Sequence, residues 1–232
     1  MIQQMHIPGP PLGHFIRFFY YYEGVPADHK VDRFLPNGDT EILIDFHDTP
    51  QFIYDNETLK EIQSCHHVWA SGVRTEPITI PAGNNAAMMV IMFRKGAAAP
   101  FFPFPMDEIS DCVFDADLIW GSGFAELREV LLAEKDIRKR FALVEAFLLG
   151  RFQNRLAENA CVDFAIGEMN RRPDALSIAR MNGQIGYSQK HFTEMFRRRV
   201  GVTPKAYLKI MRFQHAIKRI AETAEIDWAA MA

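Results

Sequence analysis

Residues 186–207 carry start and stop signals for two consecutive helices, and this stretch constrains the fold more than any other part of the chain. Ser188 is an N-cap residue, because its hydroxyl can accept a hydrogen bond from a free N–H in the first turn of a helix. Gly201 supplies the left-handed residue that commonly ends a helix. Thr203 and Pro204 open the next helix, since proline at the first position loses no hydrogen bond.

The helix between these caps has one apolar face and one polar face. The apolar face carries Phe192, Met195, Phe196 and Val200. Upstream of it, apolar residues recur at helical spacing until Gly186 interrupts them: Leu176, Ile178, Met181 and Ile185. A helix, a short turn with glycine and a second capped helix with a polar outer face predict a helix-turn-helix. The alternative is an ordinary helical hairpin with a solvated basic face.

The distribution of charge argues against that alternative. Residues 168–220 contain twelve basic and three acidic residues, a net charge of +9, whereas the whole chain has a net charge of −3. The remainder of the chain therefore carries −12. Such asymmetry within one chain indicates a nucleic-acid-binding module attached to another domain.

The order of residues 186–220 resembles the first helix-turn-helix and the bridging helix of AraC/XylS-type transcriptional regulators. The resemblance implies that double-stranded DNA is the partner and that a recognition helix enters the major groove. Carried over by position, Lys190, Thr193 and Glu194 would face the bases. Gln189, Arg197 and Arg198 would lie near the edge of the groove or the phosphates. The resemblance also makes a homodimer and RNA polymerase candidate partners.

Two departures from this family are visible. Asn182-Gly183 lies in the first helix, and a glycine there lowers helix stability by about 1 kcal/mol relative to alanine. Residues 225–232 resemble the start of the first helix of a second unit, and the sequence ends there. We therefore expect a truncated module, because Trp228 and Met231 would lack a partner helix. Binding to DNA is then expected to be weak and little dependent on base sequence.

The first hundred residues indicate short strands separated by turns. Asn37-Gly38-Asp39 is a turn signal between the segments 31–35 and 41–46, and it predicts a hairpin. Other expected strands cover residues 14–22, 51–54, 68–73, 77–80 and 87–93. Helical periodicity follows over 124–133, 136–152 and 161–171. The apolar stripe over 136–152 fits core packing within the chain, with a two-fold dimer seam as an alternative.

This half resembles the cupin-like sensor domain that precedes such DNA-binding modules. The resemblance rests on short motifs in order: 35–38 (LPNG), 72–74 (GVR), 93–96 (FRKG), 103–109 (PFPMDEI) and 118–121 (LIWG). The expected fold class is α+β, with a cupin-like β-barrel or jelly roll followed by helices over residues 1–155. An incomplete all-α helix-turn-helix domain is expected over 156–232. The implied role of the first domain is to sense a small-molecule effector or to mediate dimerisation.

Four residues are candidates for contact with an effector. Arg74 and Arg94 could hold an anion, because guanidinium groups match carboxylate and phosphate; the alternative is a structural ion pair at a strand end. Trp69 and Phe93 could line an apolar pocket, with simple core packing as the alternative. The sequence therefore leaves ligand binding and a purely structural role open at all four positions.

An enzymatic function is the alternative to a sensor. A metal-dependent cupin needs a His-x-His pair, and the chain has none; Cys65 and His67 would supply two ligands at most. No Gly-x-Ser-x-Gly motif or P-loop occurs. We therefore expect a non-enzymatic protein without metal or other cofactor. A cupin-type enzyme with an appended DNA-binding module and a non-sensing interaction protein remain as alternatives.

Cysteine content and hydropathy bear on location. The three cysteines are odd in number and far apart, so no disulfide framework is implied. No signal peptide and no apolar run long enough to span a membrane is visible. The sequence predicts a cytoplasmic protein that does not interact with membranes.

Overall fold

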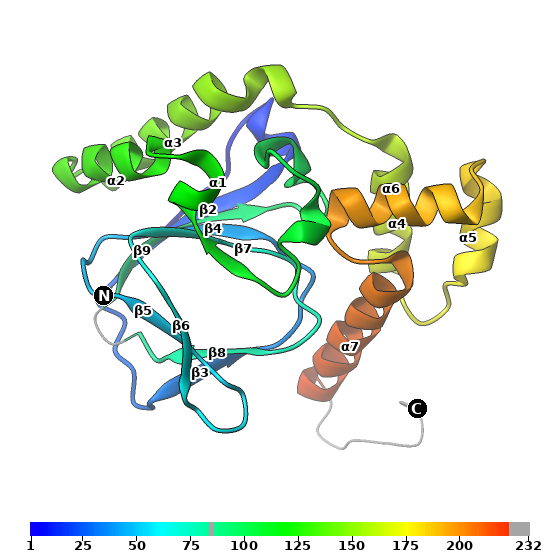
Figure 1. Ribbon diagram of the computed structural model, residues 1–232, viewed down its shortest axis with the longest axis horizontal. Helices are drawn as coiled ribbons and strands as arrows, with labels where there is room; N and C mark the ends of the chain where they lie inside the picture. The colour runs from blue at the N-terminus through cyan, green and yellow to red at the C-terminus, as the bar shows by residue number, and fades with distance from the viewer. Residues whose placement is uncertain (84–85, 223–232) are drawn as a thin grey trace.

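The computed structural model describes residues 1–83 and 86–222. The expected helix start over residues 225–232, with Trp228 and Met231, lies outside the described residues. The chain has the predicted α+β organisation, with an N-terminal antiparallel β domain followed by helices (Figure 1). Within the described residues no helix is both long enough and apolar enough to cross a membrane.

The larger sheet is entirely antiparallel. Its strands, in spatial order, are β1 (Ile2–His6), β2 (Ile16–Glu23), β9 (Ala87–Phe93), β4 (Glu41–Asp45), β7 (Val68–Ser71) and β10 (Val113–Asp115). The sequence predicted the four central strands to within two residues at most ends. It missed both edge strands, because β1 has five residues without apolar alternation and β10 has three residues.

The smaller sheet faces the larger one across an apolar cluster. Its strands, in spatial order, are β3 (Val31–Phe34), β8 (Ile78–Pro81), β5 (Gln51–Tyr54) and β6 (Glu61–Cys65). The predicted hairpin over residues 31–46 is wrong, because β3 pairs with β8 whereas β4 pairs with β7 and β9. Gly38, at φ +77°, lies in a connection that crosses from one sheet to the other.

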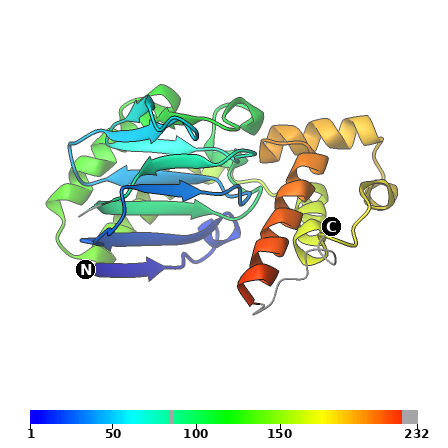
Figure 2. The same cartoon turned by 90° about the horizontal axis from the view of Figure 1, so that it is seen from below.

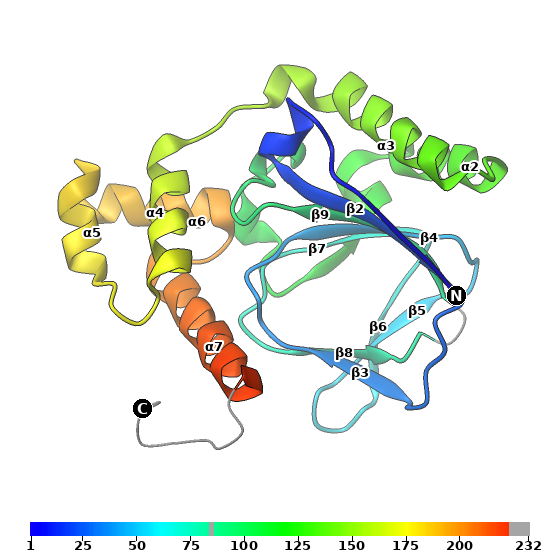
Figure 3. The ribbon, with the colours of Figure 1, turned by 180° about the vertical axis from the view of Figure 1, so that it is seen from behind.

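The other face of the larger sheet is covered by helices, as Figures 1 and 3 show. These helices are α1 (Ala116–Trp120), α2 (Gly123–Ala133) and α3 (Ile137–Phe152). On α3, Phe141, Val144, Leu148 and Phe152 are buried in the main core with Phe19, so the stripe packs within the chain, as predicted. Short 3-10 turns complete the domain: η1 (Leu12–His14), η2 (Ala99–Phe101), η3 (Met106–Glu108) and η4 (Gln153–Arg155).

The C-terminal helices have a separate apolar cluster. They are α4 (Ala160–Arg171), α5 (Ile178–Ile185), α6 (Gln189–Val200) and α7 (Pro204–Glu222). They lie against one end of the two sheets, with α5 farthest from the β domain (Figures 1 and 2). Val73 of the β domain belongs to this cluster, so the two parts of the chain share packed apolar surface.

Candidate DNA-binding surface

Helix α5 ends, and helix α6 begins and ends, at the residues that the sequence marked. Ser177 caps α5, and Gly186 ends it in the left-handed conformation at φ +78°. The Ser188 hydroxyl accepts a hydrogen bond from the His191 N–H at 3.3 Å, and Gly201 ends α6 at φ +106°. The two helices are therefore set at a fixed turn, as a helix-turn-helix requires.

A buried apolar face holds α6 in place. Phe192, Phe196 and Val200 are at most 1% exposed, and Met195 lies at the edge of this face, half-buried. The ring of Phe196 packs edge-on against Tyr207 of α7, at a centroid distance of 5.7 Å. Helix α6 is thus held between the remaining helices by aromatic contacts, which leaves its opposite face free for a partner.

The structure divides the six candidate DNA-binding residues into two groups. Gln189, Lys190, Glu194 and Arg198 are exposed, whereas Thr193 and Arg197 are half-buried. Within residues 1–83 and 86–222, Lys190 and Arg198 make no hydrogen bond or ion pair. Their cationic groups are therefore available to an external partner.

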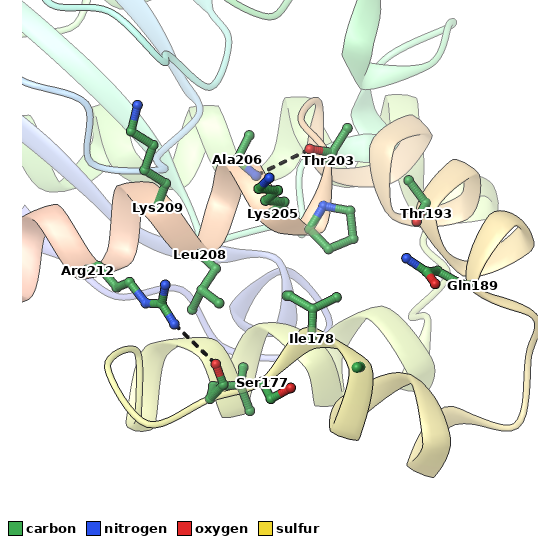
Figure 4. Close-up of a pocket in the computed structure, with 13 residues that line it drawn as sticks. Ser177, Ile178, Gln189, Thr193, Thr203, Lys205, Ala206, Leu208, Lys209 and Arg212 are labelled. Carbon is green, nitrogen blue, oxygen red and sulfur yellow. Dashed lines mark hydrogen bonds between the residues drawn. The ribbon is translucent and has the colours of Figure 1, made fainter.

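Gln189 and Thr193 point into a groove between α5, α6 and α7 (Figure 4). The groove has a volume of about 1120 Å³, and Leu176, Ile178 and Leu208 are among the apolar residues that line it. Lys205 and Lys209 from α7 also line it. No sequence motif marks these two lysines as part of the DNA-binding surface, because only the crossing of the three helices brings them close to α6.

Arg197 is held differently from the other candidates. Its guanidinium forms an ion pair with Asp107 of η3 at 3.1 Å and another with Glu194 at 3.2 Å. The hydrogen bond that Arg197 donates to Glu194, and then the charge of Asp107, raise the pKa of Arg197 above its ordinary value. Asp107 is half-buried, and its Oδ1 is buried without a hydrogen-bond partner in the described structure. Arg197, a candidate for contact with phosphate, is thus already paired with Asp107 of the β domain.

The end of α6 makes further close contacts with residues next to Asp107. The Ser110 hydroxyl donates a hydrogen bond to the Gly201 carbonyl at 2.5 Å. A Cβ atom on Gly201 would lie 2.7 Å from Ser110 Oγ and 3.2 Å from the Met106 carbonyl oxygen. No side chain fits there, so the end of α6 lies directly on η3 and its flanking loop (Figure 1).

A second contact joins the β3–β4 connection to α7. The Gln214 amide donates a hydrogen bond to the Pro36 carbonyl at 2.6 Å. Gly38 lies against Tyr207 and Met211, so that an added Cβ would approach Met211 Cε to 2.8 Å. The loop that connects the two sheets therefore rests on the helix that follows α6.

The structure does not bring the four effector-contact candidates together on one surface. Trp69 packs between the two sheets, whereas Phe93 packs under the helices against Phe101 and Phe102. The Arg94 Nε donates a hydrogen bond to the Gly13 carbonyl at 2.7 Å. The Arg74 guanidinium donates one to the Asp111 carbonyl at 3.2 Å, and its Nε is buried without a partner in the described structure.

A group of charged residues that could not be predicted from sequence lies near Arg74. Glu41, at the start of β4, is largely enclosed by protein, and burial followed by the charge of Asp39 raises the pKa of its carboxyl to about 7. Arg74 and Arg17 oppose this rise. Arg17 forms an ion pair with Asp39 at 3.4 Å, and Asp39 pairs with Lys95 at 2.9 Å. No sequence motif marks this group, because its members come from separate strands and loops.

The residues near Cys65 do not form a strand face. Cys65 ends β6, and His67 follows in a turn at φ +57° before β7 begins. Among the described residues, no group of three or more His, Cys, Asp or Glu side chains could hold a metal ion.

Comparisons with known proteins bear on both parts of the chain. Residues 4–115 match a domain of unknown function, DUF6597. Residues 173–209 match the bacterial regulatory helix-turn-helix proteins of the AraC family. No curated protein shows a significant match to the chain.

Solved structures of ToxT from Vibrio cholerae are similar at low identity. Apo ToxT from strain SCE256 is 11% identical, with a TM-score of 0.47, and the match covers 90% of this chain and 84% of that one. ToxT of that strain bound to an unsaturated fatty acid is 10% identical, with a TM-score of 0.42 over 99% and 84% of the two chains.

The capped helices, the exposed polar face of α6 and the basic charge define a helix-turn-helix DNA-binding protein. The matched segment, residues 173–209, belongs to the AraC family. The chain therefore carries an AraC-type helix-turn-helix segment behind an antiparallel β domain, and this segment supports a DNA-binding transcription regulator.

Proposed function

We propose that the protein regulates transcription by placing α6 in the major groove of DNA, where Lys190, Thr193 and Glu194 contact bases. The observation that carries this proposal is the exposed polar face of α6, on which Lys190 and Arg198 have no partner among the described residues. Arg198 contacts phosphate in this arrangement, because it lies on the outer face nearer the C-terminal end of the helix. The net charge of +9 over residues 168–220 supports attraction to DNA.

Substitutions on α6 test this arrangement. We expect Lys190→Ala and Thr193→Ala, tested in the intact regulator, to reduce the preference for the promoter over random DNA, since each base contact contributes about 1–3 kcal/mol of discrimination. Arg198→Ala is expected to weaken binding to every sequence alike, because phosphate contacts carry no base information. Titration of each variant against promoter and random duplex measures both effects. A uniform loss on both duplexes for Lys190→Ala contradicts the base contact.

Arg197 provides a test of the contact between α6 and the β domain. Asp107→Asn removes the ion pair with the β domain and leaves Glu194 of the same helix as the remaining partner of Arg197, so that a phosphate can compete for the guanidinium. We expect the salt dependence of DNA binding to steepen by up to about 0.9 in the slope of log K against log salt. Glu108→Gln is the matched control, because it removes one negative charge from the adjacent, exposed position of η3. Equal slopes for the two variants contradict the competition between Asp107 and DNA for Arg197.

The β domain is proposed to sense a small anionic molecule. The Nε atoms of both Arg17 and Arg74 are buried without partners in the described structure. The positive charges of both guanidinium groups act to lower the pKa of the Glu41 carboxyl. An anion bound by these two arginines would satisfy donors that are otherwise unpaired. Asp39 of this group follows Gly38, which contacts α7. A ligand there can therefore displace the β3–β4 connection and, through it, the DNA-binding helices.

We propose separate roles for the two parts of the chain: residues 1–155 sense the effector, and residues 156–232 bind DNA. A homodimer would present two copies of α6 to adjacent turns of the duplex. Equilibrium sedimentation of the protein with and without duplex measures whether this dimer forms.

A further inference from the structure

We propose that the sugar–phosphate backbone of DNA lies in the groove between α5, α6 and α7, where Lys205 and Lys209 contact its phosphates. This inference rests on the proposed placement of α6 in the major groove and adds a second surface, on the following helix, that continues from it. The occupant is inferred from the charge, shape and position of the groove.

The groove adjoins the proposed base-contacting face of α6. Gln189 and Thr193 form one wall, so a duplex that contacts Thr193 must pass over the groove (Figure 4). None of the residues that line it comes from the β domain. Helix α5 forms the opposite wall and is the helix farthest from that domain (Figure 1). The groove is thus open on the side from which DNA reaches α6.

Its charge is entirely positive. Lys205, Lys209 and Arg212 line it from α7, and no acidic residue is present among its lining residues. The Arg212 guanidinium already donates hydrogen bonds to the carbonyls of Pro173 and Leu176, at 2.9 and 3.2 Å. Within the described residues, neither Lys205 nor Lys209 has a hydrogen bond or an ion pair. Two of the three cations are therefore unpaired and available to an anion.

The spacing of the two lysines suits a polyanion. They lie one turn apart on the same face of α7, which places them about 6 Å apart along the helix axis. Leu208, between them, forms part of an apolar floor together with Leu176 and Ile178. An apolar floor with cations along one rim fits a chain in which phosphates alternate with deoxyribose, since the sugar carbon atoms can pack on the floor.

The helix dipoles act in the same direction as the lysines. The first turns of α5 and α7, at Ser177–Ala179 and Thr203–Ala206, both border the groove. A helix N-terminus carries roughly half a positive charge, which adds to the potential of the lysines. The groove therefore attracts phosphate more strongly than isolated surface lysines do.

The test is a titration of the full chain with a random-sequence duplex at two salt concentrations, read by fluorescence anisotropy. Two phosphate contacts contribute about 1.8 to the slope of log K against log salt. We expect Lys205→Ala/Lys209→Ala to lose this contribution, so that raising salt from about 50 to about 200 mM weakens the wild type about 12-fold more than the variant. Lys135→Ala/Lys139→Ala is the matched control, because it removes two exposed lysines near α3, far along the chain from the groove. It should keep the wild-type slope.

A second pair of variants tests the groove itself. Ala179 is exposed in the first turn of α5 and lines the groove. Ala179→Glu places a negative charge there without disfavouring the helix, because acidic side chains are stabilising near a helix N-terminus. We expect it to weaken binding to random duplex more than Ala179→Gln does, because the two side chains have the same size and differ in charge. Circular dichroism of both variants checks that the helices persist.

The outcomes separate the two proposals. A lysine double variant with the wild-type salt slope, or an Ala179→Glu variant that binds like Ala179→Gln, overturns the groove assignment and leaves the role of α6 intact. That result is also expected if a protein partner occupies the groove. A wild-type chain without measurable affinity for any duplex overturns the role of α6 and, with it, the groove assignment.

Discussion

Phe196→Ala is expected to destabilise the DNA-binding helices by about 3–5 kcal/mol, the range for removing a fully buried phenylalanine from a core. Phe196 is 0% exposed and lies between Phe192 and Tyr207, both of which are also fully buried. Removal of the ring leaves a cavity that these neighbours cannot fill without moving α6 or α7. Because domains are commonly stable by only about 5–15 kcal/mol, this loss is expected to remove a large share of the stability of the C-terminal helices.

Hydrogen exchange of backbone amides in α6 and α7 measures the effect locally, independently of the β domain. Phe213→Ala is the matched control, because Phe213 of α7 is 41% exposed. Surface substitutions away from special features usually change stability by within about 0.5 kcal/mol. Equal loss of protection in the two variants would mean that the buried face of α6 is not the one formed by Phe192, Phe196 and Val200.

The boundaries of the C-terminal helices could be predicted closely because their signals are local. Ser188 and Gly201 act within one turn of their own positions, and the structure places them at the ends of α6. Strand pairing depends on residues far apart in sequence, and here a local turn signal gave a wrong result. Asn37-Gly38 is compatible with a hairpin, but the partner of β3 is β8, about forty residues downstream of the turn.

The same distinction applies to the DNA-binding surface. Helical periodicity separates exposed from buried positions on α6, so the exposure of Gln189 and Lys190 followed from sequence. The pairing of Arg197 with Asp107 did not, because the two residues belong to different parts of the chain. The positions of Lys205 and Lys209 beside α6 likewise depend on how α7 crosses α5 and α6. A single sequence carries little information on such crossings.

Glu41 is expected to make the stability of the β domain depend on pH near neutrality. Its carboxyl has no hydrogen bond or ion pair among the described residues, and burial with the nearby Asp39 raises its pKa from 4.5 to about 7. In the unfolded chain the carboxyl ionises near its ordinary pKa, so between these values the folded state holds a proton that the unfolded state has lost. Raising the pH through this window therefore favours unfolding.

The size of the effect follows from the shift. At about 1.4 kcal/mol per pKa unit, ionising Glu41 in the folded state costs roughly 3 kcal/mol. The free energy of unfolding is therefore highest below about pH 4.5, and it falls by this amount as the pH rises above about 7. Glu41→Gln cannot ionise. We therefore expect the stability of the variant relative to the wild type to increase by up to about 3 kcal/mol between these two pH values.

Urea unfolding of wild type and variant at matched pH values measures this difference and cancels the contributions of all other titrating groups. Glu61→Gln is a suitable control, because Glu61 is exposed at the start of β6 and should give a difference that is constant with pH. A pH-independent difference for Glu41→Gln would mean that Arg17 and Arg74 stabilise the Glu41 carboxylate enough to offset its burial. That balance would also remove the two arginines as candidates for holding an external anion, because their positive charge would already be committed to Glu41.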